Sequence, residues 1–309
     1  MSLWSNLRNF EPRFDFVRWR FINFAVSAAM LIGAIIAVAT IGLNYGLDFT
    51  GGLAIEARSP NPVDLGSLRS ELAALPIGET KLQGMEDARD VLIRVQLAQH
   101  DEKAQQEAIA LIKQKLGGEF EFRQVEIIGP TVGAELLRNG ILASVLAAVG
   151  IGGYVAFRFE WRFGVSALLR TIHELMVTVG FFALLDLEFN LTAIAALLAL
   201  AGYSINDTVV VFDRIREITR KRKSAPIGEI INLAINQTLR RTVILSVCME
   251  IVLLPLVIYG GRALFNFSLS LLWGVLLGTY TSIFVAGPLI MHIAHKPRLA
   301  EGKARPATS

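Results

Sequence analysis

Residues 189–217 read FNLTAIAALLALAGYSINDTVVVFDRIRE, and this stretch decides the fold. From Phe189 to Phe212 the side chains are mostly apolar. At about 1.5 Å per residue, a helix of that length crosses a hydrocarbon core about 30 Å thick. A helix also satisfies its own backbone hydrogen bonds where no water is present. The stretch therefore predicts a membrane-spanning helix, with the acid Asp207 inside it.

The rest of the chain has the composition of a membrane protein. Of its 309 residues, 53% are hydrophobic and 18% are charged, and the mean hydropathy is +0.50. These values do not suit a soluble globule of this size. We predict an α-helical polytopic membrane protein with six transmembrane helices. The six apolar runs are roughly Phe21–Ile41, Asn139–Phe157, Phe163–Leu185, Phe189–Phe212, Thr242–Gly260 and Phe267–Ile293.

Lys and Arg residues gather at one set of flanks of these runs. The tail 1–20, the loop 213–241 and the tail 294–309 are basic, whereas the turns on the opposite side carry one Arg or none. Because cytoplasmic flanks carry the excess of positive charge, we expect both termini in the cytoplasm. The first helix is then 21–41, and the other five lie within 139–293. We interpret the basic loop as a topology signal rather than a lipid-binding or nucleic-acid-binding site.

Residues 42–138, between the first two spans, are typical of a water-soluble domain. From Asn44 to Asn139 the chain has 15 acidic and 10 basic residues, a net charge of −5, against +8 for the remainder. Apolar spacing predicts, in order, strand 53–57, helix 64–75, strands 80–85 and 90–97, helix 102–116 and strand 120–127. This β-α-β-β-α-β order is the ferredoxin-like arrangement, which we expect on the periplasmic side.

A glycine-rich motif follows the first span. It reads Gly46-Leu47-Asp48-Phe49-Thr50-Gly51-Gly52. Gly46, Gly51 and Gly52 let the backbone turn sharply or approach another element closely. Asp48 and Thr50 can cap exposed backbone donors. Alone, such a turn indicates no particular function.

The second motif is Gly202–Glu217, which places Asn206 and Asp207 inside the fourth span. An ionised carboxylate there costs several kcal/mol unless it is paired, hydrated or protonated, so a functional role is the default interpretation. Asp207 lies 18 residues after Phe189, or about 27 Å along the helix. We therefore place it in the inner half of the membrane.

Together with the six spans and the large insert, these motifs resemble the SecD/SecF family of protein-export membrane proteins, within the resistance-nodulation-division superfamily. The chain is most similar to the smaller, SecF half. The resemblance includes Leu239-Arg240-Arg241-Thr242 at the start of the fifth span and the Gly274–Ser282 stretch of the sixth. It implies an accessory subunit of the Sec translocase that uses the proton-motive force to promote preprotein export across the bacterial inner membrane.

The same resemblance implies partners and site residues. The partners are a SecD-like subunit, the Sec translocon (SecYEG) and a preprotein on the periplasmic side. The proton pathway is Asp207 with Asn206 beside it, and Arg241 as the partner of Asp207. The residues are compatible with this, because movement of the Arg241 charge toward or away from Asp207 would gate proton uptake and release. A purely structural ion pair is the alternative, and we favour the relay.

Further charged residues in the spans depart from the family pattern. The family usually has His-Asp where His173 and Glu174 stand, and a small or apolar residue at the position of Arg170. Arg170 and Glu174 are four residues apart and can pair on one helix face. We favour that pair over a second proton site. Glu250 lies at mid-membrane with no partner that the sequence identifies. These four residues are candidate additional intramembrane polar sites.

Other functional classes fit less well. We find no nucleophile with a neighbouring base, no phosphate loop and no metal cluster, so we expect no enzymatic activity, no cofactor and no metal. One alternative is a small-molecule or lipid exporter of the resistance-nodulation-division type, which normally has two inserts, one in each of two six-span repeats. The other is a non-transporting assembly factor for the translocon, in which Asp207 is structural.

Overall fold

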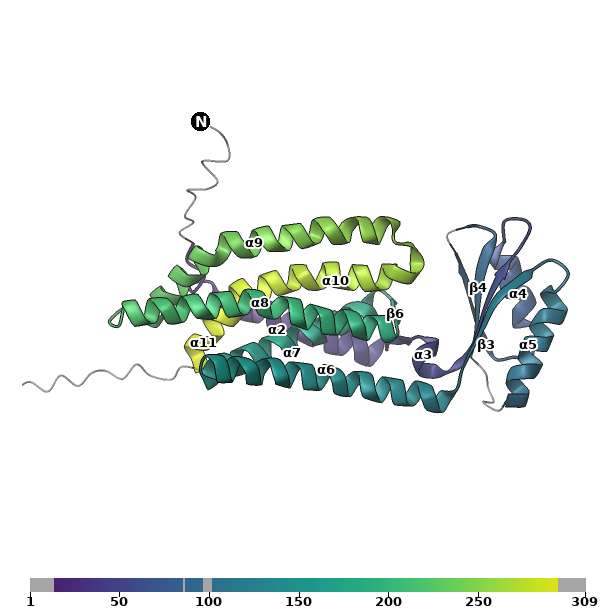
Figure 1. Ribbon diagram of the computed structural model, residues 1–309, viewed down its shortest axis with the longest axis horizontal. Helices are drawn as coiled ribbons and strands as arrows, with labels where there is room; N and C mark the ends of the chain where they lie inside the picture. Colours follow the sequence, from purple (N-terminus) through teal and green to yellow (C-terminus); the bar gives the residue numbers. More distant parts are fainter. Residues whose placement is uncertain (1–13, 86, 97–101, 294–309) are drawn as a thin grey trace, which may run out of the picture.

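A helical bundle and a small α+β domain at one of its ends make up the structure (Figure 1). This computed structural model describes residues 14–85, 87–96 and 102–293. Most of the N-terminal tail and the whole tail 294–309 lie outside the described residues. The prediction that both tails are cytoplasmic therefore stays a prediction.

Six helices of the described chain are long and apolar enough to cross a membrane, as the sequence predicts. The protein is therefore a polytopic membrane protein. The last span begins as α10 and continues through a π-helical segment, η1, into α11. The spans are α2 (Arg20–Thr40), α6 (Pro130–Arg158), α7 (Trp161–Leu184), α8 (Leu191–Lys221), α9 (Ile227–Tyr259), and α10 (Gly261–Thr281) with η1 (Ser282–Ala286) and α11 (Gly287–Ile293).

The ends of several helices differ from the predicted boundaries. Helix α6 starts at Pro130 rather than at 139. The segment expected as a basic loop, 213–241, is helical except for residues 222–226. Hydropathy marks the part of a helix that crosses lipid, whereas the helix itself continues into water. At the end of α8 the extension is stabilised by ion pairs of Glu217 with Arg214 and, at 2.6 Å, with Lys221.

The α+β domain has the predicted ferredoxin-like topology. Its antiparallel sheet has the order β3-β4-β2-β5, and α4 and α5 connect the strands as in the split β-α-β motif. Inward-pointing residues of β2 and β4, such as Leu53, Ile55 and Ile93, are fully buried against these helices. The elements are β2 (Gly52–Arg58), α4 (Leu65–Ala73), β3 (Glu79–Gly84), β4 (Asp90–Gln96), α5 (Glu102–Leu116) and β5 (Glu121–Ile128).

Burial is uneven across the bundle. Within the most apolar 18-residue stretch of each span, half or more of the residues are buried in α7 (56%), α8 (50%) and the last span (61%), but only 17% in each of α2, α6 and α9. Helices α7, α8 and α10 therefore form the interior of the bundle, and α2, α6 and α9 expose apolar surface.

Candidate proton-coupling site

A buried polar cluster lies between α7, α8 and α10, with Arg170 of α7 at its centre. Arg170 is 1% exposed. On α10 its guanidinium donates to the Thr281 hydroxyl at 3.0 Å and the Gly278 carbonyl at 2.9 Å. On α8 it donates to the Ser204 carbonyl at 3.0 Å, to the Ser204 hydroxyl, and to the Thr208 hydroxyl at 2.5 Å. One side chain thus cross-links three spans.

Glu174 is the acid nearest to this guanidinium. Its Oε2 atom lies 3.5 Å from Arg170 Nη2, the contact that the four-residue spacing predicts, and accepts a hydrogen bond from Ser204 Oγ at 2.7 Å. Its Oε1 atom is buried and has no hydrogen-bond partner among the described residues. A Cβ atom on Gly278 would lie 2.5 Å from Oε1, so this carboxylate packs directly against the α10 backbone.

Asp207 lies one turn beyond Ser204 on α8 and is 5% exposed. Among the described residues, no hydrogen bond or ion pair reaches its carboxylate, but the charges of Arg170 and Arg241 both act on it. Arg241, on α9, is exposed. The structure therefore places Asp207 between a buried and an exposed arginine without closing a contact to either, and the proton-pathway role of Asp207 and Arg241 stays a prediction.

The other predicted site residues lie around this cluster rather than in it. Asn206 is exposed, on a different face of α8 from Asp207. His173 contacts the Ser27 carbonyl of α2 through Nε2 at 3.0 Å. Glu250 on α9 is half-buried, and its Oε1 atom has no partner within the described chain.

Sequence reasoning missed the neutral partners of Arg170. Ser204 and Thr208 could have been found as polar partners from the sequence, because these two hydroxyl residues flank Asp207 at helical spacing. Gly278 and Thr281 lie in the Gly274–Ser282 stretch that carries the family resemblance, but nothing local indicates that their partner is on α7. In the described parts of the chain, no three His, Cys, Asp or Glu side chains come close enough together to hold a metal ion.

The glycine-rich motif lies at the junction between the bundle and the α+β domain. Asp48, in the short helix α3 (Leu47–Thr50), accepts a hydrogen bond from the Leu191 amide at 2.9 Å and so caps the N-terminus of α8. The Gly46 amide donates to the Phe189 carbonyl at 2.9 Å. Gly51 has φ of 70° and Gly52 has φ of 135°, which favour glycine. The motif is thus fastened to the helix that carries Asp207.

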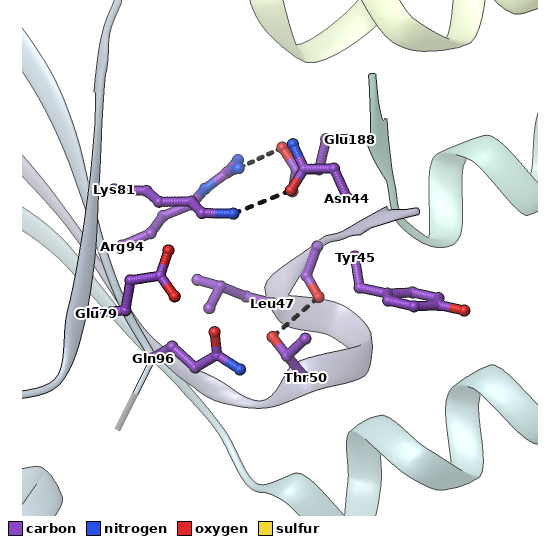
Figure 2. Close-up of a pocket in the computed structure, with 10 residues that line it drawn as sticks. Asn44, Tyr45, Leu47, Thr50, Glu79, Lys81, Arg94, Gln96 and Glu188 are labelled. Carbon is purple, nitrogen blue, oxygen red and sulfur yellow. Dashed lines mark hydrogen bonds and ion pairs between the residues drawn. The ribbon is translucent and has the colours of Figure 1, made fainter. Parts of the chain in front are cut away.

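A parallel strand pair and two polar contacts hold the α+β domain to the bundle. Strand β1 (Asn44–Tyr45) pairs with β6 (Glu188–Phe189). Figure 2 shows Arg94 and Lys81 reaching from the sheet toward this strand pair, where Arg94 forms an ion pair with Glu188 and Lys81 Nζ donates to Asn44 Oδ1 at 3.1 Å. These groups line a cavity of about 60 Å³. The junction is therefore polar and partly shielded from water.

Reversing the charge of Arg94 is expected to loosen this junction. Arg94→Glu would place a second carboxylate beside Glu188. We expect the amides of β1 and β6 to exchange hydrogen roughly fivefold faster, which corresponds to about 1 kcal/mol. Combining it with Glu188→Arg should restore slow exchange. The control is Lys115→Glu, whose partner Glu71 is 4.0 Å away on the exposed surface. Unchanged exchange in Arg94→Glu would contradict a role for this pair.

Comparison with known proteins places this geometry in a family. The C-terminal model of the protein export membrane protein SecD/SecF family matches residues 108–296, which is more than half of the chain. The SecD/SecF GG motif matches residues 36–59, which include the segment that caps α8. The two matches together cover the end of the first span, the motif and the other five spans.

Similar proteins agree with these matches. Protein translocase subunit SecF of Magnetococcus marinus is 43% identical, with 90% of this chain and 91% of that protein covered. Protein translocase subunit SecF of Rickettsia prowazekii is 37% identical, with 92% of each chain covered. The crystal structure of SecDF, a translocon-associated membrane protein from Thermus thermophilus, superposes with a TM-score of 0.81 at 34% identity. This comparison covers 94% of our chain but only 39% of that one. Because the fold, the motif and more than nine-tenths of the length of the two SecF relatives coincide, the chain belongs to the SecD/SecF family of protein export membrane proteins.

Proposed function

We propose that this chain is a SecF-type accessory subunit of the Sec protein translocase in the bacterial inner membrane. In this role it uses the proton-motive force to promote preprotein export, with a SecD-like subunit and the SecYEG translocon as partners. It acts by changing conformation and catalyses no covalent reaction. Relatives with 91–92% of their length covered are named protein translocase subunits, which supports the assignment to the translocase.

The observation that carries proton coupling is the position of Asp207. It is buried on α8 within reach of the charges of Arg170 and Arg241. The other end of the same helix is capped by Asp48, next to the α+β domain. A change of charge at Asp207 therefore acts on a helix that is attached directly to the domain outside the membrane. This gives a physical route from proton binding to domain movement.

The exposed faces of the bundle support a membrane-embedded partner. In α2, α6 and α9 only 17% of the most apolar 18-residue stretch is buried. The SecDF chain from Thermus is much longer, since our chain covers 39% of it. A SecD-like subunit would cover part of the exposed apolar surface. On α9 the exposed residues include Ile244, Val247, Ile251, Val252, Leu254 and Ile258.

The distribution of charge supports an orientation. The turn between α8 and α9 lies at the end of the bundle opposite the α+β domain (Figure 1). It is strongly basic, with Arg220, Lys221, Arg222 and Lys223 in sequence. Because positive loops stay on the cytoplasmic side, this charge supports an orientation with the α+β domain in the periplasm and both termini in the cytoplasm.

Removing the charge of Asp207 is expected to weaken the response to the gradient strongly. In spheroplasts that secrete a preprotein, export is measured with the gradient intact and after an uncoupler collapses it. We expect Asp207→Asn to lower the gradient-dependent part on the order of tenfold, a barrier change of about 1.4 kcal/mol. The reason is that an amide cannot cycle between neutral and charged forms.

Asp213→Asn is the matched control, because Asp213 is exposed on the same helix, six residues further on. It should export like the unaltered protein. Full gradient-dependent stimulation in Asp207→Asn would refute proton coupling at this site. Gradient-dependent efflux of small molecules, with preprotein export unaffected, would favour an exporter of the resistance-nodulation-division type instead.

A further inference from the structure

The buried cluster contains more acids than cations. Arg170 and Glu174 are each 1% exposed, and Asp207 is 5% exposed. The charges of all three act on one another. With both acids ionised, one negative charge in this interior would have no buried counter-charge. Such a charge is strongly disfavoured in a low-dielectric site unless a proton neutralises it.

We propose that Glu174 and Asp207 share a single proton, so that Glu174 is a second proton-binding residue of this chain. The inference rests on the proposed proton coupling and adds a residue to it. Arg170 supplies the one buried positive charge, and it balances whichever carboxylate is ionised. When the proton is on one acid, the other is charged.

The contacts of Glu174 fit a group that gains and loses a proton. Its Oε2 atom is held by the Ser204 hydroxyl at 2.7 Å, whereas its Oε1 atom is buried without a hydrogen-bond partner among the described residues. A carboxylate kept permanently ionised would be expected to have both oxygens paired in so buried a place. A hydroxyl group can either accept or donate, so Ser204 can serve both protonation states.

The two acids lie at different depths. Ser204, which contacts Glu174, is one turn nearer than Asp207 to the end of α8 that Asp48 caps. Glu174 is therefore the acid closer to the α+β domain, and Asp207 the acid closer to the basic end. A proton that enters from the side of the α+β domain reaches Glu174 first.

Of the other polar and charged groups around the cluster, Arg241 is the one whose movement would release the proton. On α7, His173 faces the Ser27 carbonyl of α2, and α10 contributes the neutral Thr281 hydroxyl and Gly278 carbonyl. On α9, Glu250 is half-buried and Arg241 is exposed. Arg241 is thus the second cation that acts on Asp207. When it moves against Asp207, two cations balance two carboxylates and the shared proton is released.

Infrared difference spectroscopy tests whether Glu174 and Asp207 share one proton. The sample is the chain assembled with its SecD-like partner in lipid. The carbonyl stretch of a protonated carboxyl group is recorded at neutral pH and identified by its shift in heavy water. All samples carry Glu250→Gln, so that this acid adds no band of its own. We expect one carboxyl band, which is lost both in Glu174→Gln and in Asp207→Asn, because the charge of Arg170 then balances the one remaining acid in its ionised form.

The alternative is that Glu174 is a permanent structural partner of Arg170 and only Asp207 binds a proton. In that case Glu174→Gln keeps the band, and this result would overturn the proposal. So would a band that survives in Asp207→Asn, or no band in the parent protein. Helical circular dichroism and co-purification with the partner check folding.

Glu174→Asp gives a second measurement that retains the carboxylate. Sharing predicts that the band persists at a shifted frequency, and an unshifted band would contradict it. Because no export is measured, these spectra test the sharing separately from the proposed function. Loss of gradient-dependent export in Asp207→Asn with an unchanged band in Glu174→Gln would uphold the function and reject the sharing.

Discussion

Arg170→Leu is expected to lower the stability of the protein by about 3–5 kcal/mol, the typical cost of removing one member of a buried ion pair. Leucine would leave Glu174 without its cation. It would also leave the Ser204, Thr208 and Thr281 hydroxyls without the donor that joins three helices. The measurement is thermal unfolding in mild detergent, followed by the amount of protein that stays monodisperse after heating.

Two further variants make this result specific. Arg170→Lys keeps the charge but has one ammonium group in place of the planar guanidinium, so it should recover only part of the loss. Arg162→Leu, on the same helix but at its partly exposed first turn, should have little effect. Equal stability of Arg170→Leu and the unaltered protein would mean that the cluster does not hold the helices together.

Gly278→Ala is expected to disrupt the same cluster from the side of α10. The added Cβ atom would lie 2.5 Å from Glu174 Oε1 and 2.8 Å from Ser204 Oγ, so α10 must move away from α7 and α8. Overpacking of this kind costs about 1–3 kcal/mol. We also expect gradient-dependent export to fall on the order of tenfold, because the Glu174 carboxylate is displaced.

Gly202→Ala is the matched control for this change. Gly202 is also a glycine in a transmembrane helix, but a Cβ atom there would meet nothing within 4 Å. It should leave both thermal stability and export unchanged. If the two alanine variants behaved alike, the close packing of α10 against Glu174 would have no functional importance.

The sequence predicted the transmembrane helices and the strands, because both depend on the local spacing of apolar residues. Six apolar runs gave the spans, and alternation in β4 gave a half-buried strand. The ferredoxin-like order followed because strands and helices differ in their apolar spacing. The sequence did not predict that α6 and α8 extend as helices beyond these apolar runs. Polar residues such as Arg214 and Glu217 at the end of α8 can continue a helix as readily as they start a loop.

The candidate site could be predicted only in part, for a geometric reason. Spacing shows which residues share a face of one helix, and so it indicated the contact between Arg170 and Glu174. It does not show which helices pack together. The roles of Gly278 and Thr281 depend on the packing of α10 against α7. The family pattern indicated Arg241 as the cation acting on Asp207, and only the packing of the helices adds Arg170 as a second one.

The two chain connections of the α+β domain to the bundle lie next to each other. The chain passes into this domain through α3 and leaves it through α6. These two connections touch, since a Cβ atom on Gly133 would lie 2.6 Å from the Phe49 carbonyl oxygen. A domain whose two ends meet behaves as an insertion in the membrane unit. It can be lengthened, replaced or exchanged between relatives without altering the path of the six spans, so the bundle can be conserved while the α+β domain diverges.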